Sequence, residues 1–383
     1  MTYGRQRLWL GITGVGSTVL LCTIVLAFDL PHRLVSTRTD ASFGWALAAI
    51  ALSWMIHAAL LTPVDLIGGL VVVREPRRFW SFVASWLRAV AVQWAWFMVA
   101  AAVLLRTGQS LGTGWAIGAF LLLQVVLLRG QLPLARLVGG VHVVPTSPAL
   151  IAAAGAAGIA PGTVREVEGD DIAFVGAWTG ALARYLYIPR RWVQSLSADE
   201  LSYALARRAA ARVLGLRQRG VMVALAWNTT GFALSAVAPL ADLTTAPGFI
   251  AVLAWFTLWS FAGVVVLPSA SRPAIYALDR WAQRLRNTDT AARTIRKLDR
   301  WQDDEADRDP RVELVFHPVP SLRSRLEALS GLALPTGPEF DKAGAWHATR
   351  MMLYLSWAGL GGLARAVHCN VGRPALWVML PGD

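Results

Sequence analysis

Six long runs of apolar residues separate the polar segments of this chain. Each run is long enough, or nearly so, for a helix to cross the hydrocarbon core of a bilayer, which is about 30 Å thick. Four runs come first and two follow a mixed segment, so the pattern predicts an α-helical polytopic membrane protein with a small α+β lobe after the fourth span. The predicted spans are residues 8–28, 43–61, 82–105, 111–128, 221–240 and 249–267.

The same pattern predicts the domain organisation. We expect an N-terminal transmembrane region of four spans (1–128), a lobe (129–220), two further spans (221–268) and a C-terminal region (269–383). Within the last region, residues 351–364 are apolar but too short to span. We therefore expect a buried helix or one at the membrane surface.

Composition and charge agree with a membrane location. The chain is 55% hydrophobic, its mean hydropathy is +0.48 and it has 18 tryptophans. Many of the arginines behind its net charge of +12 flank spans, where they meet anionic headgroups, so we expect membrane lipid as a partner and no nucleic acid. Because basic residues mark the cytoplasmic side, we expect the N-terminus and lobe in the cytoplasm, with the chain in a bacterial inner membrane. The basic clusters are Arg5 and Arg7, Arg74, Arg77 and Arg78, and Arg129 and Arg136.

A capping box begins a predicted helix at residues 196–214. Ser197 precedes Glu200 by three residues, the spacing at which each side chain accepts a hydrogen bond from the other's backbone. In zinc metallopeptidases an H-E-x-x-H motif on such a helix supplies two ligands and a glutamate that polarises the bound water. Here Arg207, Arg208 and Ala211 stand in those positions.

The order of these parts resembles the HtpX and CAAX prenyl protease type of membrane zinc metallopeptidases, over roughly residues 135 to 330. Four groups of residues carry the resemblance. They are Ile172, Ala173, Phe174, Val175 and Gly176, similar to an N-A-F-x-x-G strand; Leu196, Ser197, Glu200, Leu201, Leu205 and Ala206, similar to the lead-in to the zinc motif; Ser271, Arg272, Tyr276, Asp279 and Arg280, similar to the third-ligand helix; and His317, Pro318 and either Arg323 or Arg325, similar to the H-P motif and a downstream arginine.

The chain departs from the family pattern at the zinc ligands and at the general base. Arg207 and Ala211 replace both histidines, Arg208 replaces the general base, and Ile275 replaces the third ligand. A guanidinium offers no lone pair to a metal or a proton, so we expect no zinc, no other cofactor and no catalytic residue. The resemblance then implies a zincin-like lobe in a pseudopeptidase that is not an enzyme.

Three functions stay open. The first is a binding, assembly or scaffold protein for a membrane-protein partner, which it would hold by strand addition beside Ala173, Phe174, Val175 and Gly176. The second is a metalloendopeptidase with an unrecognised site that uses His317 and the acidic run at 303–309. The third is a structural or lipid-binding subunit in which Arg207, Arg208 and Arg212 bind an anion or partner carboxylate.

Polar residues inside the spans give weaker signals. His57, Arg88, Gln93 and Asn228 lie within predicted spans, where such groups serve either packing and snorkelling or a proton or substrate path. A G-x-x-x-G pattern in the fourth span favours close helix packing, either within the chain or in an oligomer.

Overall fold

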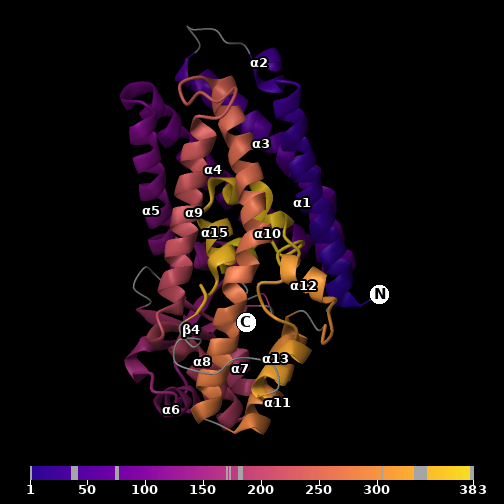
Figure 1. The fold of residues 1–383 in the computed structure, drawn as a ribbon, viewed down its shortest axis with the longest axis vertical. Helices are drawn as coiled ribbons and strands as arrows, with labels where there is room; N and C mark the ends of the chain where they lie inside the picture. The colour runs from indigo at the N-terminus through magenta and orange to yellow at the C-terminus, as the bar shows by residue number, and fades with distance from the viewer. Residues whose placement is uncertain are drawn as a thin grey trace.

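A bundle of long helices stands above a smaller lobe of helices and strands, and α10 runs through both (Figure 1). The computed structural model describes residues 2–35, 42–73, 77–169, 171, 174–179, 184–285, 287–302, 305–331 and 343–379. The bundle consists of α1 (Tyr3–Ala27), α2 (Leu30–Leu34), α3 (Phe43–Leu66) with its continuation η1 (Ile67–Val71), α4 (Phe79–Leu111), α5 (Thr113–Gly139), α9 (Leu216–Ala236) and α10 (Ala246–Leu285).

The lobe holds the remaining elements up to residue 329. Its strands are β1 (His142–Val144), β2 (Val164–Glu168), β3 (Ala177–Thr179) and β4 (Tyr185–Pro189). Its helices are α6 (Pro148–Ala156), η2 (Pro161–Thr163), α7 (Arg190–Ser195), α8 (Ala198–Val213), α11 (Thr288–Trp301), α12 (Pro310–Phe316) and α13 (Leu322–Leu329).

Five helices in the described part of the chain are long and apolar enough to cross a membrane, one fewer than the sequence predicts. They are α1, α3 with η1, α4, α5 and α10. Helix α9 covers most of the predicted span at 221–240 but is not among these five, so that span stays a prediction. The helix packs against α5, α10 and the C-terminal helix α15.

The lobe is built on a four-stranded mixed sheet with the order β1-β2-β4-β3. Strands β1 and β2 pair in antiparallel fashion, and their presence beside helices agrees with the α+β lobe that the sequence predicts. The predicted strand at 172–176 is wrong in place: residues 172 and 173 lie outside the described residues, and 174–176 are irregular. Strand β3 begins at Ala177, directly after the last residue of the predicted strand. Gly176 itself adopts a φ of +82°, which an extended strand does not accept.

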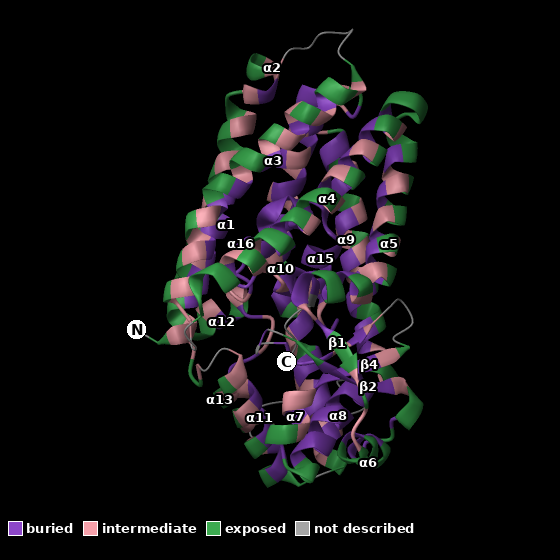
Figure 2. Cartoon of the chain, turned by 180° about the vertical axis from the view of Figure 1, so that it is seen from behind, coloured by how far each residue is buried: buried purple, intermediate pink, exposed green. Residues whose placement is uncertain are grey.

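Residues 345–378, here called the inner segment, run inside the helix bundle (Figures 1 and 2). The inner segment contains α15 (Ala348–Leu355), η3 (Gly359–Leu363), α16 (Ala364–Ala366) and most of α17 (Leu376–Met379). Nearly every residue in it is buried, so of the two states expected for 351–364 the structure has the buried one. It contacts α9 and α10 through α15, α3 and α4 through η3, and α5 through α17.

Polar side chains of the bundle donate to carbonyls in the short helices of the inner segment. The last carbonyls of a helix have no partner within it, and lipid tails offer no donor, so protein donors are needed. Two of the four polar residues noted inside predicted spans meet this need: Gln93 Nε2 donates to Gly359 O at 3.0 Å, and Asn228 Nδ2 donates to Met352 O at 3.0 Å. These residues therefore serve packing of the chain on itself, as does Gln131, which donates to Val378 O at 3.2 Å.

A buried ion pair ties the inner segment to the bundle. The Arg365 guanidinium donates to Asp65 Oδ2 at 2.7 Å, and both side chains are at most 3% exposed. Asp65 also accepts from Trp86 Nε1 at 3.0 Å. A carboxylate next to the end of an apolar run and an arginine within another apolar segment are the sequence signals from which such a pair could be predicted.

Candidate functional site

Helix α8 starts as the sequence predicts. Ser197 Oγ accepts from the Glu200 backbone N–H at 3.4 Å, and Glu200 Oε2 accepts from the Ser197 N–H at 2.9 Å, which confirms the capping box. Lys297 on α11 also donates to Glu200 Oε2, at 2.6 Å. Burial alone would raise the pKa of the Glu200 carboxyl, but these hydrogen bonds outweigh it and hold the pKa below its usual value. The start of α8 is thus anchored to α11.

Halfway along α8, a buried ionic cluster joins three helices. Arg207 Nε lies 2.6 Å from Asp279 Oδ1 on α10. Arg325 on α13 binds the same carboxylate through two nitrogens, with Nε at 2.8 Å from Oδ2 and Nη2 at 2.9 Å from Oδ1. Each of the three side chains is at most 5% exposed. We call these residues, Arg207, Asp279 and Arg325, the ionic clamp.

The clamp resolves the choice between two arginines that the resemblance left open. Arg325 enters the buried cluster, whereas Arg323 is 68% exposed and pairs with Asp307 and Glu327 at the surface. Tyr203, one turn before Arg207, lies against the clamp. Burial, followed by the nearby Asp279 charge, raises the pKa of its phenol, so this hydroxyl stays protonated.

Arg208 points to a different part of the lobe core. Its guanidinium lies over the rings of Trp192 and Trp346, with centroid distances of 5.7 and 5.5 Å, and donates to Val175 O at 3.1 Å. At 1% exposure it is among the most buried charged residues in the described part of the chain. Arg207 and Arg208 therefore have partners inside the protein, while the third candidate anion ligand, Arg212, stacks over Trp178 at 5.5 Å.

The residues at the zinc-motif positions do not fit a zinc ion. Zinc sites in proteins use thiolate, imidazole and carboxylate ligands. Arg207 and Arg208 have no lone pair to offer, and Ala211 and Ile275 belong to the apolar core of the lobe. The one carboxylate beside them, Asp279, already carries two guanidinium groups. The geometry makes this a rigid junction of α8, α10 and α13.

Arginine side chains occupy the segment expected to be the peptide groove. The carbonyl of Phe174 accepts from Arg191 Nη2 at 2.9 Å, and that of Val175 accepts from Arg208. On β3, the carbonyl of Trp178 accepts from Arg217 Nη2 at 3.4 Å. Gly176 is close to β4, since a Cβ there would meet Tyr187 O at 2.5 Å, and Ala173 lies outside the described residues. The edge beside β3 is therefore already occupied.

The opposite edge of the sheet has a different environment. Strand β1 is the outermost strand on that side, with β2 as its neighbour. Its first two residues, His142 and Val143, are exposed, and Figure 2 shows the strand at the surface below the bundle. Among the described residues no further strand pairs with it. An edge of this kind can accept an extended segment from another chain.

Two histidines, His317 and His368, have their rings in contact. The rings of His317, at the end of α12, and His368, in the inner segment, lie 4.8 Å apart, and His317 is 3% exposed. The described residues contain no group of three or more histidine, cysteine, aspartate or glutamate side chains that could hold a metal. Two residues of the acidic run proposed beside His317, 303 and 304, lie outside the described part of the chain.

Comparison with known proteins gives one informative result, from structure. No protein-family model matches the sequence, and no curated protein matches it. Among solved structures, the chain is similar to a crystal structure of Ste24p from S. mikatae. The TM-score is 0.64 and the identity 13%, over 81% of this chain and 82% of that one. Ste24p is a CAAX prenyl protease, and the comparison shows that this chain shares its fold.

The comparison changes one conclusion from the sequence. We predicted that the chain is not an enzyme, and this prediction is contradicted: the chain shares its fold with Ste24p, which is a protease. At 13% identity the similarity concerns the fold rather than the reacting residues. Together with the five apolar helices, it supports an integral membrane protein.

Proposed function

We propose that this chain is a membrane metallopeptidase homologue that holds an extended segment of a membrane-protein partner, with a zincin-like lobe on the cytoplasmic side of a bacterial inner membrane. The observation that carries the proposal is the exposed edge of β1. The carbonyls of Phe174 and Val175, in the segment first expected to form the groove, accept from Arg191 and Arg208, whereas among the described residues no strand pairs with the outer edge of β1, whose His142 and Val143 are exposed. Strand addition along β1 supplies main-chain hydrogen bonds to the bound segment.

The ionic clamp supports this function through rigidity. Binding an extended segment costs less free energy when the edge that receives it is already ordered. The clamp joins α8 to α10 and α13, and Arg208 joins α8 to the backbone just before β3. The sheet is therefore held on helices that α10 connects directly to the membrane bundle.

Photo-cross-linking from the β1 edge tests the proposed function. A photoreactive phenylalanine analogue at Val143 should give a discrete adduct with one membrane protein in native membranes, because this side chain lies on the exposed strand. The matched control is Val237, also exposed but at the end of α9 (74% exposed, against 41% for Val143). No adduct at Val143, or the same adduct at both positions, contradicts the proposal.

A second candidate function is a metal-dependent membrane endopeptidase, favoured by the contact between His317 and His368 on a protease-like fold. The two imidazoles would supply two of the protein ligands that a catalytic metal ion needs, and the metal would activate a water for hydrolysis. Their positions bring the inner segment and α12 together.

Metal analysis separates this candidate from the first. If the histidine pair holds a metal, purified protein contains about one equivalent and cleaves casein, and His317→Ala loses both. The control His142→Ala, on the exposed β1, should retain both. Failure to find a metal, or cleavage that His317→Ala leaves unchanged, eliminates this candidate while leaving the binding function to the cross-linking test.

A further inference from the structure

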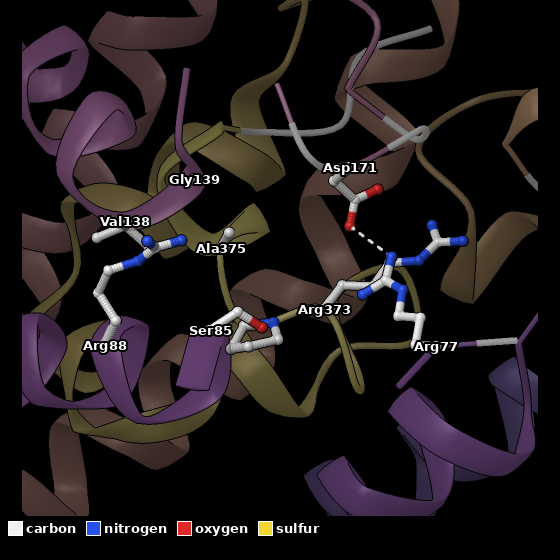
Figure 3. Close-up of a pocket in the computed structure, with 9 residues that line it drawn as sticks. Arg77, Ser85, Arg88, Val138, Gly139, Asp171, Arg373 and Ala375 are labelled. Carbon is white, nitrogen blue, oxygen red and sulfur yellow. Dashed lines mark ion pairs between the residues drawn. The ribbon is translucent and has the colours of Figure 1, made fainter. Parts of the chain in front are cut away.

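A small basic pocket lies where the bundle meets the lobe. Its walls come from segments far apart in the sequence: Arg77 just before α4, Ser85 and Arg88 on α4, Asp171 in the lobe, and Arg373 in the inner segment. Figure 3 shows these side chains around the pocket, with Asp171 next to Arg77. The folded protein thus gathers three guanidinium groups that the sequence does not place together.

Positive charge exceeds negative charge among these side chains. Arg77 lies 3.6 Å from Asp171, the one acidic residue in the lining. Arg373 is 8% exposed and donates to the hydroxyl of Tyr3, a neutral acceptor, at 2.6 Å. One carboxylate among three guanidinium groups leaves an excess of two positive charges. Such a cluster favours an anion that can accept several hydrogen bonds, as a phosphate does.

The pocket lies at the level expected for lipid headgroups. Two aromatic residues, Phe79 (51% exposed) and Trp80 (76% exposed), begin α4 directly after the Arg77 segment. Exposed aromatic side chains at the end of a span mark the boundary between the hydrocarbon core and water. From two turns further along α4, the long side chain of Arg88 can reach back to this boundary while its methylene groups stay in the apolar region.

The size of the pocket restricts the ligand. Its volume of about 30 Å³ compares with the roughly 10 to 15 Å³ that one water requires on the same scale. The oxygens of a phosphate group can enter, whereas a nucleotide or a sugar is too large. The remainder of the ligand must stay outside, which a lipid whose chains lie in the bilayer does.

We propose that this pocket binds the phosphate group of an anionic membrane lipid, with Arg77 and Arg88 as the ligands that approach it from the membrane side and Arg373 as the buried ligand. This site differs from the arginines of α8, which have partners in the lobe core.

Binding of short-chain lipids by the purified protein in mild detergent tests the proposal. Dihexanoyl phosphatidate should bind, while dihexanoyl phosphatidylcholine and inorganic phosphate should bind at least about tenfold more weakly. The double variant Arg77→Gln/Arg88→Gln should lose about tenfold or more in phosphatidate affinity, as expected for two charge-assisted hydrogen bonds. Both side chains are partly exposed, so the variant should keep the wild-type thermal midpoint.

The control Arg106→Gln/Arg129→Gln removes two exposed arginines from α4 and α5 away from the pocket. It should bind phosphatidate as the wild type does. If inorganic phosphate and phosphatidate bind with equal affinity, the phosphate that the pocket binds is not that of a lipid. Equal affinity for the two lipids, or unchanged binding by the pocket variant, overturns the site.

Discussion

Replacing Asp279 with Asn is expected to destabilise the lobe by about 3 to 5 kcal/mol, because it leaves two buried guanidinium groups without a counter-charge. Arg207 and Arg325 are at most 5% exposed and share this carboxylate, so neither can move to water without opening the junction of α8, α10 and α13. Amide hydrogen exchange of peptides from α8 measures the effect, since exchange there requires this junction to open.

A triple variant shows whether the loss of stability comes from leaving buried charges without a partner or from losing the clamp itself. Arg207→Met/Asp279→Leu/Arg325→Met removes the whole ionic clamp and fills the space with apolar groups, so it should recover most or all of the wild-type protection. The surface control is Asp307→Asn, whose partner Arg323 is 68% exposed, and it should leave α8 exchange unchanged. If Asp279→Asn protects α8 as well as the wild type does, the clamp does not hold the lobe together.

Replacing Asp65 with Asn should release the inner segment from the bundle. Asp65 accepts hydrogen bonds from Arg365, Trp86 and the Gly372 N–H, and it balances a guanidinium that is fully buried. Loss of its charge should cost about 3 kcal/mol or more, which corresponds to a roughly hundredfold larger population of the released state.

Limited trypsin digestion measures this release. Arg350 and Arg365 lie in the inner segment and are largely inside the protein in the folded state, so cleavage after them should become about a hundredfold faster in Asp65→Asn if opening is fast compared with cleavage. The control Asp29→Asn removes the carboxylate of a half-exposed pair with His32 and should change nothing. Equal cleavage rates in Asp65→Asn and the wild type would show that the inner segment does not depend on this ion pair.

The sequence predicts the parts of the fold that depend on local patterns. Long apolar runs locate the five candidate spans, and the spacing of Ser197 and Glu200 locates the start of α8. The apolar run of α9 does not by itself show that polar Asn228 donates to a carbonyl inside the bundle.

The parts that the sequence did not predict depend on contacts between distant segments. The apolar run in the inner segment is too short to cross a membrane. Its position inside the bundle depends on contacts with distant helices, such as the hydrogen bonds that Gln93 and Asn228 donate to its carbonyls. The resemblance placed Arg207 and Asp279 at two ends of one site, but their pairing depends on how α8 and α10 cross. The basic pocket combines segments from four parts of the chain, so no motif marks it.

An ion pair between Arg207 and Asp279, completed by Arg325, stands where the resemblance places a zinc motif. X-ray data collected on both sides of the zinc absorption edge, from crystals of protein purified with zinc present, test whether a metal can replace this ion pair. We expect the Arg207 guanidinium to lie within hydrogen-bond distance of the Asp279 carboxylate, with no anomalous peak at the junction of α8, α10 and α13. An anomalous peak there, with Asp279 turned away from Arg207 to ligate an ion, would contradict it.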